Sequence, residues 1–252
     1  MKEKLILPGI SPLADYIGLE GLKKFSDPAL SERDKIEQRS LLHRKIRHGM
    51  TEAMIATLFL QHFNHKFSRE VVVQIQTGFV LHDIGMAFMG LKWWGNGQKT
   101  RPSINGQKFD HVSRGLEMIA NFESKNPWWG STPVVRDIVK LHHERKNGTG
   151  LHEVEGKDLS FIGHMAIIVD QLVSRCEPRP YNGKYPRQTL REAVDTLKSE
   201  PHLYDLGIVE KFEKVFDVYF SDVNSAKFEE RGLGGLKWLA VGWSESTNNS
   251  SG

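Results

Sequence analysis

The stretch REVVVQIQTGFVLHDIG, residues 69–85, decides the fold class of this chain. Within it, apolar residues and one histidine recur at steps of four, four and three residues, which is the spacing of one face of an α-helix. Ser68 precedes the run and can cap the helix. The face therefore ends on a polar side chain in a place where packing favours an apolar one. Its four positions are Val71, Ile75, Phe79 and His82.

Helical spacing extends over nearly the whole chain. No stretch alternates as a β-strand does, and we find no internal repeat. The sequence therefore predicts an all-α fold. Further helices are expected through the thirties and forties, after Gly49, from His111 onward, after Thr132–Pro133, over 159–174, and near 188–199 and 206–219.

Composition is that of an ordinary globular protein. The 252 residues are 39% hydrophobic and 26% charged, with a net charge of +3, so no nucleic-acid polymer is expected as a partner. A single cysteine, Cys176, fits a reducing cytosol. No apolar run approaches the roughly 20 residues that span a bilayer, and the N-terminus does not read as a signal peptide. We expect a cytoplasmic protein with no membrane segment.

Several histidines and aspartates occupy helical positions that ought to be apolar. A single such histidine is usually a core residue satisfied by one hydrogen bond, whereas a buried lone carboxylate such as Asp170 demands a cation or several donors. Five expected helices each turn such a group inward, toward what should be one core. The seven residues are His48, His82, Asp83, His111, His142, His143 and Asp170.

These side chains are the ligands that first-row divalent metal ions prefer. Cysteine is absent from the set, which disfavours a structural zinc site. Seven groups exceed the need of one ion, while two ions that share a carboxylate would use them all. We therefore expect two divalent transition-metal ions, Fe or Mn first, with Ni, Co or Zn as alternatives. Two-metal sites of this kind typically catalyse hydrolysis of phosphoesters.

The ordered set resembles the HD-GYP domain, the bacterial branch of the HD phosphohydrolases. LHDIG at 81–85 is similar to the family's HD motif, and HHERKNGTG at 142–150 to its HHE stretch. The sequence Arg179-Pro180-Tyr181 resembles an RPYR element that follows the last metal ligand. Two departures stand out. Met86 takes the place of a lysine, and Gly150-Leu151-His152 takes the place of the signature tripeptide.

The resemblance implies a fold and a role for each position. It implies a helical HD bundle at 36–222. From composition we also expect an N-terminal extension at 1–35 and, at 223–252, a C-terminal segment whose polar last residues, 244–252, form a disordered tail. Arg179 and Gly150 would contact the substrate, and Asp83 would bridge the two ions. Of the remaining ligands, His48, His82 and Asp170 would bind one ion, and His111, His142 and His143 the other.

The implied activity is hydrolysis of a cyclic dinucleotide, chiefly cyclic di-GMP, by a hydroxide held between the ions. Asp83 and Arg179 would be its catalytic residues. Two alternatives stay open because of the departures at Met86 and 150–152. One is a signalling or binding module with little or no turnover. The other is an HD phosphohydrolase for another nucleotide phosphoester. A homodimer or a signalling partner is also left open.

Overall fold

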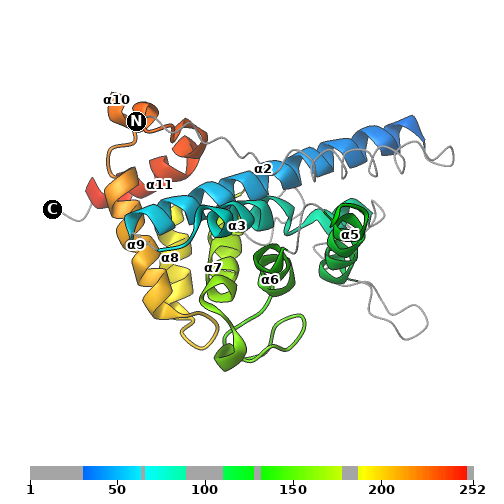
Figure 1. Cartoon of the computed structure of the whole chain (residues 1–252). Coiled ribbons are helices and arrows are strands. Elements are labelled where there is room, and N and C mark those ends of the chain that lie inside the picture. The colour runs from blue at the N-terminus through cyan, green and yellow to red at the C-terminus, as the bar shows by residue number, and fades with distance from the viewer. Residues whose placement is uncertain (1–30, 64–65, 89–109, 128–131, 178–186, 249–252) are drawn as a thin grey trace. The chain divides into compact units, whose positions relative to one another are not determined.

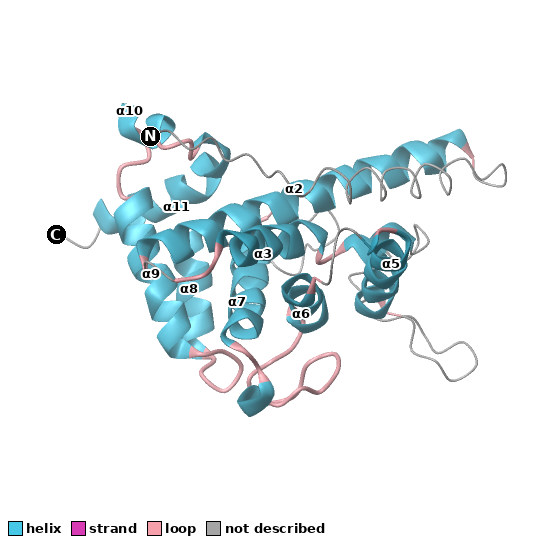
Figure 2. Ribbon diagram, in the orientation of Figure 1, coloured by secondary structure: helices cyan, strands magenta, loops and turns pink. Residues whose placement is uncertain are grey.

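The structure is a computed structural model that describes residues 31–63, 66–88, 110–127, 132–177 and 187–248. In these ranges the chain forms α-helices and short 3₁₀-helices and no β-strand, which confirms the all-α prediction (Figure 2). None of these helices is both long enough and apolar enough to cross a bilayer.

The chain divides into two compact units that are interleaved in sequence. Unit 1 comprises Met1–Ala53 and Phe67–Lys140, and unit 2 comprises Met54–Lys66 and Leu141–Gly252. The boundary near residue 53 falls inside one long helix, α2 (Glu32–His62) (Figure 1).

Unit 1 contains the first part of α2 together with α3, α5, α6 and one short helix. The expected break at Gly49 is wrong, because α2 runs through it without interruption. A Cβ at Gly49 would lie 2.4 Å from the carbonyl oxygen of Phe79, so the glycine lets the backbones of α2 and α3 approach closely. The bounds are α3 (Arg69–Leu81), η1 (Ile84–Phe88), α5 (His111–Lys125) and α6 (Pro133–Leu141).

The start signals that the sequence predicts for unit 1 are in place. Ser68 caps α3 by accepting a hydrogen bond from the backbone N–H of Val71, and α6 begins at Pro133. Asp110 caps α5 through the N–H of Ser113. Apolar side chains of α5 and α6 then form a buried cluster, in which Ile119 packs with Val135 and Val139.

Unit 2 is built around α7, whose residues from Met165 to Asp170 are all buried. Helices α8, α9 and α11 pack against one another beside it (Figure 1). A capping box between Thr189 and Glu192 starts α8. The bounds are η3 (Gly156–Asp158), α7 (Phe161–Cys176), α8 (Leu190–Ser199), α9 (Leu206–Phe220), α10 (Ala226–Glu230), η4 (Gly234–Leu236) and α11 (Lys237–Asn248).

The C-terminal segment belongs to this core. Trp243 is fully buried, 5.3 Å from the ring of Phe216, and the guanidinium of Arg191 lies 3.5 Å above its ring centroid. Helix α11 continues past Trp243 to Asn248, so it includes the first residues of the polar stretch at the end of the chain. Burial of Trp243 anchors the helix, which the polar composition of the last residues did not reveal.

Candidate metal centre

Unit 1 gathers five buried metal-ligand side chains from three parts of the chain. Helix α2 carries His48 and Glu52 one turn apart, the turn after α3 carries His82 and Asp83, and α5 begins at His111. The Nε2 atom of His48 lies 2.9 Å from Oε1 of Glu52, and Nδ1 of His82 lies 3.2 Å from its Oε2. The ligand atoms of these three residues lie within 4.8 Å of one another.

Asp83 joins this group to α5. One carboxylate oxygen lies 3.3 Å from Nε2 of His111, and the other lies 3.4 Å from Nε2 of His82. Gly85 makes this approach feasible, since a Cβ there would lie 1.8 Å from the carbonyl oxygen of His111. The glycine of LHDIG is therefore required by the contact between η1 and the start of α5.

The ring of His82 is oriented by its own helix. Its Nδ1 lies 2.6 Å from the carbonyl oxygen of Phe79. A carbonyl can only accept, so Nδ1 carries the proton, and in the neutral ring Nε2 is the atom left to bind a metal ion. The local helix geometry therefore sets the tautomer that a metal ligand needs.

The charges of unit 1 are strongly coupled. Burial alone would lower the pKa of His82, but the Glu52 and Asp83 carboxylates raise it to about 9. Burial would raise the pKa of Asp83, but Lys45, with Nζ 2.5 Å from Oδ2, and the imidazole of His82 hold it well below its usual range. Burial lowers the pKa of His111. Asp83 is thus an anion at neutral pH.

Unit 2 brings the other three predicted ligands together. His142 and His143 lie in the turn directly after α6, with ring centroids 4.1 Å apart, rather than on the helix as the spacing predicted. Nδ1 of His143 lies 3.7 Å from Oδ2 of Asp170 on α7. Asp170 also accepts a hydrogen bond from the hydroxyl of Ser174. His142 and Asp170 are buried, and His143 is partly buried.

The residue after the two histidines ties down the following loop. Glu144 is buried and accepts hydrogen bonds from the backbone N–H groups of His152 and Val154, at 2.7 and 2.9 Å. Gly150, predicted to contact substrate, packs directly on it, since a Cβ there would lie 2.4 Å from the Cα of Glu144. The close packing on Glu144 thus explains why position 150 in this loop is a glycine.

Two residues of unit 1 were missed by sequence reasoning, Glu52 and Lys45. Both were detectable in principle, because they lie four residues after and three residues before His48, on neighbouring turns of one helix. The predicted substrate ligand Arg179 lies outside the described residues, as does 89–109, most of the loop expected between the HD motif and His111. Met86 lies in η1 and is partly buried.

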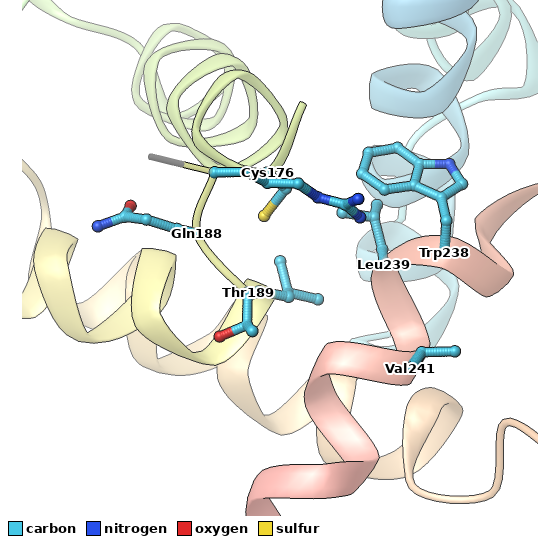
Figure 3. A pocket seen from close by; sticks show the side chains of 8 residues that line it. Cys176, Gln188, Thr189, Trp238, Leu239 and Val241 are labelled. Atoms are coloured by element: carbon cyan, nitrogen blue, oxygen red, sulfur yellow. The ribbon is translucent and has the colours of Figure 1, made fainter. Parts of the chain in front are cut away.

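A separate cavity of about 220 Å³ lies in unit 2, between the end of α7, the start of α8 and α11 (Figure 3). Its lining includes Cys176, Trp238 and Arg187, whose guanidinium lies 5.6 Å from the Trp238 ring centroid. Burial raises the pKa of the Cys176 thiol to about 12, so it stays neutral. No predicted metal ligand lines this cavity, which therefore lacks the chemistry of the candidate centre.

The donor chemistry fits divalent metal ions. The described residues include two groups of buried or partly buried imidazole and carboxylate side chains that could bind such ions, and this is the ligand set of borderline first-row metals. Compared with known proteins, the chain matches no family model, and no curated protein is significantly similar to it.

Proposed function

We propose that this protein is a metal-dependent phosphodiesterase that hydrolyses a cyclic dinucleotide, with cyclic di-GMP as the first candidate. The observation that supports it most is that all seven residues of the predicted ligand set lie beside another member within their own unit. This order of ligands along the chain, with LHDIG at its centre, is what resembles the HD-GYP domain.

In this proposal, two ions bind the combined ligand set. His48, His82 and Asp170 hold one, His111, His142 and His143 hold the other, and Asp83 is shared. Iron or manganese suits this mixture of imidazole and carboxylate, and nickel, cobalt or zinc are the alternatives. When bound, such ions make water a nucleophile at neutral pH and neutralise charge on the phosphate.

The chain's own residues prepare this chemistry. Asp83 is held as a carboxylate by Lys45 and His82, so no proton has to leave it before metal binds. The carbonyl of Phe79 orients His82. Lys45 keeps 29% of its side chain exposed, so its ammonium could also meet a phosphate that approaches Asp83. Arg179 is proposed as the second phosphate ligand because its planar fork suits that group.

One observation favours a second candidate, a binding or signalling module that keeps its metal ions but does not turn over. The position after LHDIG is Met86, a partly buried thioether that cannot neutralise a phosphate. The loop segment Gly150-Leu151-His152 also departs from the family signature. An HD phosphohydrolase for another phosphoester would accommodate the same two departures.

An anaerobic activity panel separates these candidates. The protein is purified in reducing buffer, its metal content is measured, and cyclic dinucleotides and simple phosphoesters are offered with Mn²⁺ or Fe²⁺. Linear dinucleotide or mononucleotide on chromatography supports the phosphodiesterase. Binding without product favours the module, and turnover of another phosphoester favours the third candidate.

Two histidine variants control this panel. His111→Asn should abolish turnover, whereas His202→Asn, at an exposed histidine near the start of α9, should not change it. A wild-type protein that takes up no transition metal would overturn the metal-dependent proposal altogether.

A further inference from the structure

Glu52 is a carboxylate in the centre of unit 1 to which the resemblance gives no role. It lies in the interior of α2, and its exposed fraction is 0%. A carboxylate removed from water is costly unless cations or several donors compensate it. Glu52 faces two imidazoles of the predicted ligand set, those of His48 and His82. Its burial at this point therefore indicates a role in the same centre.

The distances fit a shared ion. Metal–ligand bonds of about 2.0–2.2 Å set at right angles place the two donor atoms about 3 Å apart. Oε1 of Glu52 and Nε2 of His48 lie 2.9 Å apart. The four-residue spacing on α2 keeps both side chains on one face of the helix, so this geometry is preformed.

We propose that Glu52 is a direct ligand of the ion held by His48 and His82. This proposal rests on the proposed function and deepens it, because it gives unit 1 a three-residue metal site of its own. The centre is then asymmetric. One ion is bound chiefly by unit 1, whereas the other depends on His142 and His143 of unit 2. Unit 1 should therefore keep its ion when the ligands from unit 2 are removed.

The competing role for Glu52 is to position His82 by accepting a hydrogen bond from its Nδ1. Nδ1 lies 3.2 Å from Glu52 but only 2.6 Å from the carbonyl oxygen of Phe79. The backbone therefore already orients the ring. The Glu52 carboxylate is not needed to orient His82, and its Oε1 lies 2.9 Å from Nε2 of His48, a separation that suits two ligands of one ion. It is therefore better explained as a ligand.

Cobalt titration of the metal-free protein tests this directly. Co²⁺ uptake is followed by visible absorption and elemental analysis, in the wild type, in Glu52→Gln and in Glu144→Gln. Glu144 is the matched control, because it is also a buried glutamate but accepts from backbone N–H groups. We expect two ions in the wild type and in Glu144→Gln. In Glu52→Gln we expect one ion, with affinity at the other position lowered by more than about 100-fold.

That threshold separates the two roles. Losing a group that only supports a ligand typically costs about 10–100-fold in metal affinity. A loss of about 100-fold or less, or two ions with an unchanged cobalt spectrum, would overturn the proposal. If the wild type itself binds no ion, the proposed function fails as well. If it binds two ions and Glu52→Gln is indistinguishable from it, only the role of Glu52 fails.

Two further variants keep the test decisive. If circular dichroism shows that Glu52→Gln does not fold, Glu52→His restores a donor at the same position. A folded Glu52→His protein with an altered cobalt spectrum or a lost ion supports direct ligation, and one with two ions and an unchanged cobalt spectrum overturns it. The double variant His142→Asn/Asp170→Asn should retain one ion. Complete loss of cobalt from that folded protein would contradict a site contained in unit 1.

Discussion

The two units present their metal-ligand groups in different ways. In unit 1 the groups lie on α2, on α5 and in the turn after α3, and their ring nitrogens lie 2.9–3.4 Å from neighbouring carboxylate oxygens. In unit 2 the two histidines lie in a turn, and Nδ1 of His143 lies 3.7 Å from Oδ2 of Asp170. In unit 1, glycines at 49 and 85 allow the close backbone contacts beside the candidate ligands, whereas in unit 2 Glu144 secures the loop after the two histidines.

This difference teaches that the same ligand chemistry can depend on two kinds of support. Unit 1 has an ammonium, that of Lys45, beside its central carboxylate, so its charges are partly balanced before any metal binds. In unit 2, the loop that follows the two histidines is held by backbone hydrogen bonds to one buried glutamate, Glu144. We therefore expect charge changes to act mainly on unit 1, and loop changes mainly on unit 2.

The largest effect should come from removing the charge at the centre of unit 1. Asp83→Asn keeps the size of the side chain but leaves Lys45 and His82 facing a neutral amide. We expect metal content to fall and turnover to drop at least about 100-fold, the upper end of the cost of losing a supporting group. Elemental analysis and product chromatography check this. Full turnover in Asp83→Asn would contradict its role as the shared ligand.

The next largest effect is a loss of stability in unit 2. Glu144→Ala removes two hydrogen bonds to a charged acceptor, and we expect the free energy of unfolding to fall by about 3 kcal/mol. Urea denaturation measures that change, and hydrogen exchange should show faster exchange at the N–H groups of His152 and Val154. Glu144→Gln, which keeps one acceptor oxygen, should lose less. Equal protection of the loop in Glu144→Ala would show that the glutamate does not secure it.

The stability of the metal-free protein should depend on pH through His82 of unit 1. The pKa of His82 is raised to about 9 in the folded, metal-free protein, above its ordinary value of 6.5. Its stabilisation is therefore complete below pH 6.5 and is lost as pH rises through 9. We expect the free energy of unfolding to fall by about 1–3 kcal/mol over that interval. Urea titrations at several pH values check this. His82→Gln should flatten the profile, and an equally steep profile in that variant would refute the assignment.

The smallest effect is expected at the cavity in unit 2, which no predicted ligand lines. Cys176→Ala removes one buried sulfur beside an existing cavity in unit 2, so the cost should be about 1 kcal/mol. Metal content should not change. Any loss of cobalt from this variant would show that the packing around the cavity is coupled to the metal centre.

The helical class could be read from the sequence because apolar spacing and capping residues are local signals. Ser68 and Pro133 start their helices as predicted, and Ile75 and Phe79 of the stripe are buried on α3, with the buried His82 directly after its end. The break predicted at Gly49 was wrong, because in the sequence a glycine that ends a helix cannot be told from one that permits close packing until the neighbouring helix is known. The last turns of α11 were not predictable for a similar reason, since Trp243 anchors them through tertiary contacts.

The candidate site was predictable where side chains stand out against an apolar background, as His82 and Asp170 do. Glu52 and Lys45 lie on a helix rich in charged residues, so only their spatial relation to His48 and Asp83 marks them. Which charged groups neutralise one another depends on their proximity in three dimensions. Helical spacing alone cannot supply it.

The contact at Gly85 has a consequence for engineering this chain. Only a hydrogen atom fits between that residue and the backbone of His111, so the two ends of the intervening segment are pinned at a fixed junction. Exchanging 89–109 for unrelated sequences of different length should leave the separation of Asp83 and His111 intact. Such exchanges would therefore test what 89–109 contributes to the proposed activity without rebuilding the donors on either side.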